Sequence, residues 1–154
     1  NMDDPSVYMD ENNRRMCMNL RNNFARLAEA LFREGKKDKA IEVLDRCIAT
    51  MPNENIPYNF FILPAVESYY KMGEYDKANE IVKILLTMYT QESDYYFALD
   101  NERFKQIKNE AQQAVSVLYR LSQLTNEVYP QDVVGPMVKQ EFDRLQPVFN
   151  SMLN

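Results

Sequence analysis

Two octapeptides that nearly repeat one another constrain the fold of this chain more than any other feature. The sequence reads REGKKDKA at 33–40 and KMGEYDKA at 71–78, so that Gly, Asp, Lys and Ala recur at a spacing of 38 residues. Glycine adopts the left-handed conformation that ends many helices without the steric cost that other residues incur. The recurrence therefore predicts two helix–turn–helix corners of the same design, one at Gly35 and one at Gly73.

Apolar residues on both sides of the first corner recur with the period of an α-helix. Before Gly35, the apolar face comprises Leu20, Phe24, Leu27, Ala28 and Leu31. After it, the apolar face comprises Ala40, Ile41, Leu44, Cys47, Ile48 and Met51. We expect Asp38 to cap the second of these helices and Pro52 to mark its end.

The segment around the second corner follows the same pattern. A helix is predicted from Pro57 through Tyr70, and Pro64 should kink this helix or delay its regular start. Asp76 is expected to cap the next helix. The apolar face of that helix comprises Ala78, Ile81, Val82, Leu85 and Tyr89.

The remaining sequence also favours helix and contains no strand-like alternation. We expect a loop with a short helical piece at 90–102, a long helix at 103–125, and a break at VYPQDVVGP. A last helix is predicted at 137–152, which Pro147 should bend or shorten. With residues 1–9 as a lead-in segment, the prediction is one all-α domain at 10–154, made of antiparallel helix hairpins.

Length and composition are those of a globular domain. The chain has 154 residues, of which 45% are hydrophobic and 27% charged, and this is enough to bury a core. The net charge is −5, and residues 53–102 contain nine acidic but only three basic residues. No basic patch is present, so nucleic acid is not an expected partner. The longest apolar run, FFILPAV, is far shorter than the roughly 20 residues of a membrane span.

The sequence offers little material for catalysis. It contains no histidine, which excludes Ser-His-Asp and Cys-His nucleophile systems and removes the commonest metal ligand. Three glycines cannot form a Gly-rich phosphate loop. We therefore predict no catalytic, cofactor or metal site. Cys17 and Cys47 fit no metal or redox motif and are interpreted as small buried residues, with a disulfide as the alternative in an oxidising compartment.

The pattern resembles the tetratricopeptide repeat, a helix pair of 34 residues with large and small residues at fixed positions and a terminal proline. A first unit at about 21–54 matches well, with Phe24 and Ala28 in its first helix and Pro52 at its end. A second unit at about 59–92 lacks the final proline, and about four residues are inserted around NENIPY. The resemblance implies a short right-handed superhelix, with divergent flanking helices completing the core.

In such repeats the first helices line a concave face that binds other proteins. The matching positions that we select as groove residues are Asn22, Arg26, Glu29, Phe32, Arg33, Phe60, Glu67, Tyr70 and Lys71. Aromatic side chains among mixed charges suit an extended peptide or a partner helix. The alternative is that this face packs against the last helix of the chain. A carboxylate clamp is not expected, because Ala25 and Glu29 occupy its first-unit positions.

The aromatic cluster DYYFALD at 94–100 has two open interpretations. It either docks between hairpins or forms an exposed interaction patch. The chain begins with Asn1 and not with methionine, so we expect a segment of a longer protein, or a processed or tagged product.

A narrower resemblance covers about residues 8–125. The stretches DENNRRMCMNLRNNFARLAEALFREGKKDKAIEVLDRC and MPNENIPYNFFILPAVESYYKMG resemble the soluble C-terminal region of a family of large multi-pass membrane proteins. That family occurs in Bacteroides-like bacteria and is similar to protein O-mannosyltransferases. The resemblance implies a helical module appended to a membrane enzyme, facing the periplasm in preference to the cytoplasm.

We therefore expect a non-catalytic module that binds a protein or peptide. The alternatives are an accessory domain that helps a membrane glycosyltransferase engage its acceptor, and a self-association module.

Overall fold

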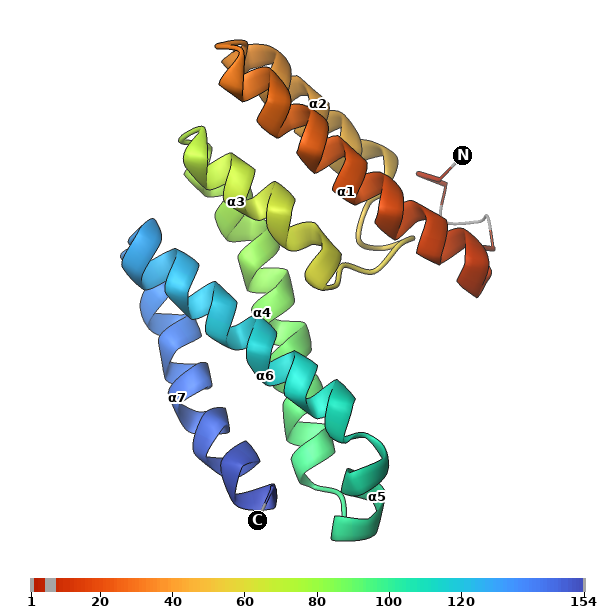
Figure 1. The fold of residues 1–154 in the computed structure, drawn as a ribbon, viewed down its shortest axis with the longest axis vertical. Coiled ribbons are helices and arrows are strands. Elements are labelled where there is room, and N and C mark those ends of the chain that lie inside the picture. The colour runs from red at the N-terminus through yellow and green to blue at the C-terminus, as the bar shows by residue number, and fades with distance from the viewer. Residues whose placement is uncertain (1, 5–7, 154) are drawn as a thin grey trace. The chain divides into compact units, whose positions relative to one another are not determined.

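The computed structural model describes residues 2–4 and 8–153 and contains helices but no strand among them (Figure 1). This confirms the predicted all-α class. The chain divides into two compact units, Asn1–Ala78 (unit 1) and Asn79–Asn154 (unit 2). In order, the helices are α1 (Glu11–Arg33), α2 (Lys37–Thr50), the 3₁₀ turn η1 (Phe60–Ile62), α3 (Leu63–Lys71), α4 (Tyr75–Phe97), α5 (Asn101–Gln106), α6 (Lys108–Gln123), the π-helical turn η2 (Leu124–Val128) and α7 (Val134–Met152).

The two predicted corners are confirmed and have the same construction. Gly35 has φ 77° and Gly73 has φ 80°, both in the left-handed region. At the first corner the amide of Gly35 donates to Phe32 O at 2.9 Å, and the amide of Lys36 donates to Leu31 O at 2.9 Å. The second corner repeats both bonds 38 residues later. These bonds satisfy carbonyl groups that a helix end would otherwise leave unpaired.

The predicted capping residues are wrong. Asp38 and Asp76 lie inside the first turns of α2 and α4, and the residue that precedes α2, Lys36, makes no side-chain capping bond. The N-cap position of α2 is occupied by Lys36, whose ammonium can donate but cannot accept a hydrogen bond from the first amides of the helix. An acidic side chain in the first turn still interacts favourably with the partial positive charge of the helix N-terminus.

The buried face of α1 differs from the predicted one. The helix buries Cys17, Arg21, Ala25 and Ala28, whereas Leu20 is 38% exposed and Leu27 is 50% exposed. Alanines at the contact allow α2 and α3 to pack closely against α1, as Figure 1 shows for α1 and α2. The leucines therefore remain on the outer surface of this helix.

Arg21 is a buried cation in the middle of unit 1, with only 1% of its surface exposed. Its guanidinium donates to three backbone carbonyls of the α2–η1 loop: Pro57 O at 3.1 Å, Met51 O at 2.8 Å and Ile56 O. The guanidinium carbon also lies 4.8 Å from the centroid of the Tyr58 ring. Burial lowers the pKa of Arg21, and these contacts fix the inserted loop that lengthens the repeat.

Cys17 and Cys47 are both buried and free, in a cluster that also contains Met51 and Ile56. This agrees with their interpretation as small core residues, and the structure contains no bond between them. Burial raises the pKa of the Cys47 thiol to about 11, so this thiol is uncharged at neutral pH.

Pro64 delays the regular start of its helix, as predicted. The chain first makes the 3₁₀ turn η1, and α3 then begins with Pro64 in its first turn. Proline is well tolerated there because the first amides of a helix have no partner within the helix.

In unit 2 two of the predicted boundaries are wrong. The loop expected at 90–102 is largely helical, because α4 continues to Phe97 and only the following three residues leave the helix. The helix expected at 103–125 is interrupted at Ile107, between α5 and α6. The predicted final helix is confirmed, although α7 begins at Val134 and continues past Pro147 to Met152.

The aromatic cluster at 94–100 divides between two environments. The ring of Phe97 packs against Phe104 and Phe149, with centroid distances of 6.3 and 6.1 Å, so it docks inside unit 2. Tyr95 remains exposed at the surface. Asp94 accepts two bonds from the guanidinium of Arg144, at 2.7 and 3.0 Å, which ties α4 to α7.

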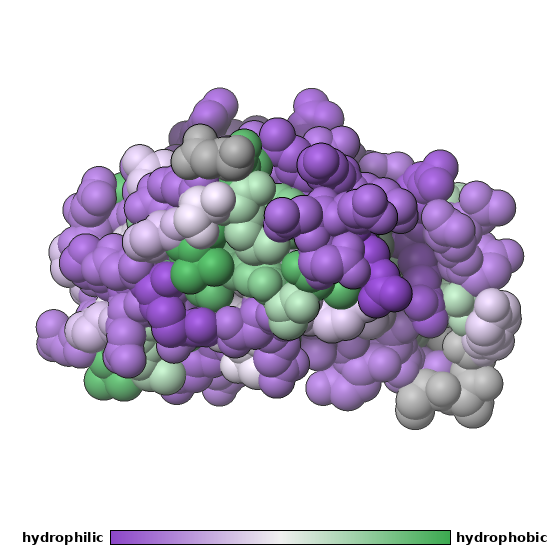
Figure 2. All heavy atoms as spheres, turned by 90° about the horizontal axis from the view of Figure 1, so that it is seen from below, coloured by the Kyte–Doolittle hydropathy of each residue, from purple (hydrophilic) through white to green (hydrophobic). Residues whose placement is uncertain are grey.

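The surface seen in Figure 2 is mainly hydrophilic, with hydrophobic residues showing near the centre of the view and in smaller groups elsewhere, one of them at the lower left. Within the described residues, no helix combines the length and the apolarity needed to cross a bilayer.

Candidate peptide-binding groove

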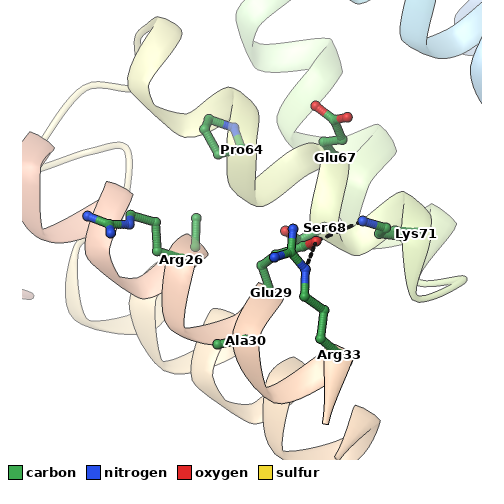
Figure 3. Close-up of a pocket in the computed structure, with 9 residues that line it drawn as sticks. Arg26, Glu29, Ala30, Arg33, Pro64, Glu67, Ser68 and Lys71 are labelled. Atoms are coloured by element: carbon green, nitrogen blue, oxygen red, sulfur yellow. Dashed lines mark hydrogen bonds and ion pairs between the residues drawn. The ribbon is translucent and has the colours of Figure 1, made fainter. Parts of the chain in front are cut away.

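An open groove of about 490 Å³ lies between α1 and α3 in unit 1 (Figure 3). We refer to it as the groove. Its lining residues are Ala25, Arg26, Glu29, Ala30 and Arg33 from α1, and Pro64, Glu67, Ser68 and Lys71 from α3. On each helix these residues recur at spacings of three and four, so they occupy one face.

The groove exists because small and large residues alternate on these two faces. Ala25, Ala30 and Ser68 have short side chains that leave space between the helices, and Pro64 adds a rigid ring. The long charged side chains stand around this space. In Figure 3 the side chain of Arg26 extends away from the Glu29 carboxylate, and so exposes a cationic group at one end of the groove.

Glu29 connects the two helices. Its Oε1 accepts from Lys71 Nζ at 2.9 Å across the groove and from Arg33 Nε at 3.1 Å along α1. The hydrogen bond from Lys71 is the main reason why the pKa of Glu29 is lowered. Because these side chains are solvent-accessible, each ion pair contributes about 0–1 kcal/mol to stability. Their main effect is to fix the positions of the charged groups in the groove.

Five of the nine residues selected from the sequence line the groove: Arg26, Glu29, Arg33, Glu67 and Lys71. Asn22 and Phe32 are half-buried on α1 and are not among the lining residues. Phe60 lies in η1, where its ring stacks on Phe61 with a centroid distance of 4.2 Å.

The selection of Tyr70 as a surface anchor is wrong, because Tyr70 is only 1% exposed. Burial raises the pKa of its phenol, and its ring packs 6.3 Å from the ring of Tyr75. On α3 it belongs with Val66 and Tyr69, which are also buried. The groove consequently offers no aromatic side chain among its lining residues.

Sequence reasoning did not select Ala30, Pro64 and Ser68, although they complete the groove. A signal was present, since Ala30 follows Arg26 by four residues and Ser68 follows Pro64 by four. Small residues at such positions identify places where two helices leave room, whereas our selection favoured large side chains.

A second polar network fixes α3 and the start of α4 onto α2. Asp45 accepts from the Tyr69 hydroxyl at 2.9 Å, and its two oxygens accept from Lys77 Nζ at 2.9 and 2.7 Å. The hydrogen bond to Asp45 is the main cause that raises the pKa of Lys77. This network holds α3, one of the two groove helices, against α2.

Residues 26–53 match the family model of the tetratricopeptide repeat. The matched segment begins within α1, contains the Gly35 corner and the whole of α2, and ends just beyond it. No curated protein and no solved structure matches the chain. Together, the match and the two equal corners define a tetratricopeptide-like helical domain. Repeats of this class stack into concave surfaces that bind other proteins.

Proposed function

We propose that this chain is a non-catalytic protein–protein interaction module, and that unit 1 binds an extended segment of a partner protein in the groove. The observation that supports this most directly is the convergence of Arg26, Glu29, Arg33, Glu67 and Lys71 around a floor of small side chains. They come from two helices related by the tetratricopeptide-like repeat.

The chemistry of the groove suits a polar peptide better than an apolar helix. Charges of both signs line it, and Glu29 is already bonded to two cations. A partner with acidic and basic residues at matched positions would gain orientation from these charges, and the open small-residue floor would accept its backbone. Binding of this type weakens as ionic strength rises, because exposed charges are screened.

A photo-cross-linking residue placed at Glu67 tests the location of binding. In the native host it should capture a protein that the same residue at Glu42, an exposed position on α2, does not capture. The captured protein is then purified and titrated against the isolated chain.

Charge reversal of the groove gives the quantitative test. The double variant Arg26→Glu/Lys71→Glu should weaken binding by about tenfold or more. The matched control Lys37→Glu/Arg46→Glu changes the net charge equally but lies on exposed positions of α2, so it should bind almost as well as the wild type. Circular dichroism establishes that both variants keep their helical content. Equal affinity of the two variants would refute the groove assignment.

We further propose that the module is appended to a multi-pass membrane protein and helps a glycosyltransferase engage its acceptor on the periplasmic side. The support is the sequence resemblance over about residues 8–125. Reading the native frame upstream of Asn1 tests the context, since several apolar stretches of about 20 residues are expected there. Loop charge would then decide between periplasm and cytoplasm. Deleting the module should reduce turnover of the enzyme; a loss of assembly alone would contradict an acceptor-binding role.

A further inference from the structure

The outer face of α1 carries an exposed row of four residues with the spacing of a coiled-coil seam. Met16, Leu20, Asn23 and Leu27 follow one another at intervals of four, three and four residues, and each is exposed. Met16 is 64% exposed and Leu27 is 50% exposed. We call these four residues the seam. Intervals of four and three place successive residues on one stripe of a helix, where a second helix can pack.

The helix of unit 1 that the repeat relates to α1 is α3, and it shows what this face of a repeat contacts. Moving 38 residues along the chain relates Leu27 of the seam to Ala65. Ala65 is 1% exposed on α3, which packs against α1 and α2. The position that is covered on α3 is thus exposed on α1. A helix face that stays in water is typically polar, whereas three of the four seam residues are apolar.

We propose that the seam is the contact surface for a second copy of this chain, with the two α1 helices packed antiparallel about a two-fold axis. The intervals of the seam read the same in both directions, so an antiparallel pair places Met16 against Leu27 of the other copy. Leu20 then faces Asn23 of the other copy. A symmetric dimer requires such a self-complementary surface.

The charges along α1 favour this pairing over a parallel one. No seam residue is charged, so two chains with a net charge of −5 can meet there without opposing like charges. In the antiparallel pair Arg26 flanks the seam opposite Asn19 of the other copy, whose amide oxygen can accept from it. A parallel pair would instead place Arg26 at the same level as Arg26 of the other copy. It would also orient the two helix dipoles in the same direction. Asparagine within a seam restricts the register and the oligomeric state.

The size of the seam sets the strength of the association. It extends over about 17 Å of helix, which is short for a coiled coil. Interfaces of small area form transient complexes. The expected species is therefore a dimer in reversible equilibrium with the 18.2 kDa monomer.

Sedimentation equilibrium of the full chain tests the proposal. The weight-average mass should rise from that of one chain towards that of two as concentration increases from low micromolar towards millimolar. Leu27→Glu should hold the mass at one chain, because it buries a carboxylate in the contact. Arg15→Glu, an exposed change on α1 outside the seam, should dimerise like the wild type. A wild type that stays monomeric throughout, or a Leu27→Glu variant that dimerises normally, would overturn the proposal.

A pair of charges tests the antiparallel register. Leu20→Lys alone should abolish dimerisation. The double variant Leu20→Lys/Asn23→Glu should restore it, because each introduced lysine then faces an introduced glutamate of the other copy. In a parallel pair like charges would meet and no rescue would occur, so failure of the rescue refutes the antiparallel arrangement. Circular dichroism confirms the fold of each variant.

Discussion

Units 1 and 2 both contain tight corners between antiparallel helices, but they form these corners by different means. In unit 1, Gly35 and Gly73 adopt positive φ, and a Cβ added to either would meet nothing within 4 Å. In unit 2, a Cβ on Gly135 would lie 2.6 Å from the carbonyl oxygen of Thr125. The side-chain amide of Asn126 donates to Gly135 O at 3.0 Å and so joins η2 to α7. The corners of unit 1 depend on backbone conformation, and the corner of unit 2 depends on contact.

One connection in unit 1, the α2–η1 loop, depends on side-chain contact and not on backbone conformation. Disrupting it should have the largest effect on stability. The α2–η1 loop depends on Arg21, whose guanidinium pairs three buried carbonyls. Arg21→Met would keep the apolar stem but leave those carbonyls unpaired, at an expected loss of about 3–5 kcal/mol in the free energy of unfolding. Urea denaturation measures this loss. Arg26→Met on the exposed face of α1 is the control and should change stability by less than about 0.5 kcal/mol.

Gly135→Ala tests the contact-based corner of unit 2. The added methyl group collides with backbone, which cannot move aside as a flexible side chain can, so we expect a loss of about 2–3 kcal/mol. Hydrogen exchange should increase first at amides of the α6–α7 corner. Val133→Ala, an exposed neighbouring position, is the control and should be nearly neutral. A stable Gly135→Ala variant would show that close approach does not define this corner.

Gly73→Ala tests the conformation-based corner of unit 1, and the expected loss is smaller, about 1–2 kcal/mol. The space for the methyl group is open, so only the positive φ opposes the change. Asparagine tolerates this conformation better than alanine, so Gly73→Asn should cost less than Gly73→Ala. At Gly135 the order should reverse, because asparagine is larger. The same order at both sites in thermal denaturation would remove the distinction between the two corners.

The same distinction explains what the sequence could predict. A need for positive φ belongs to a single residue, so the repeated glycines identified both corners of unit 1. The roles of Arg21 and Gly135 depend on the backbone that lies across from them, which no local pattern records. Arg21 gave one signal, since it lies four residues after Cys17 and seven before Ala28, on the buried face of α1. Charged residues on such a face are usually assigned to solvent.

For the groove, too, the sequence predicted the features that depend on local pattern and missed those that depend on packing. The helical period placed Arg26, Glu29 and Arg33 together on α1, and this set lines the groove. The period cannot decide which side of a short helix faces the core, and Tyr70 was therefore assigned to the wrong side of α3. The polar composition of 90–102 predicts a loop, and it does not reveal packing partners that lie far along the chain. Arg144, which holds Asp94 of α4, is one of them.

The smallest expected effects concern two glutamates whose pKa values shift in opposite directions. In unit 1, hydrogen bonding to Lys71 lowers the pKa of Glu29. In unit 2, burial raises the pKa of Glu92. The stability that Glu29 contributes is present above its unfolded pKa and is lost as pH falls through the folded value. The contribution of Glu92 is present below its unfolded pKa and is lost as pH rises through the raised folded value.

Replacing each glutamate by glutamine should therefore give opposite changes at neutral pH. Glu92→Gln should stabilise the chain at pH 7 by a few tenths of a kcal/mol, because a neutral side chain replaces a partly buried charge, and this gain should vanish near pH 4. Glu29→Gln should destabilise it by a similar amount at pH 7, with the loss also fading towards acid pH. Denaturant titrations at both pH values, with each variant compared with the wild type, measure the four differences. Changes of the same sign at pH 7 would show that burial in unit 2 and ion pairing in unit 1 do not dominate these two carboxylates.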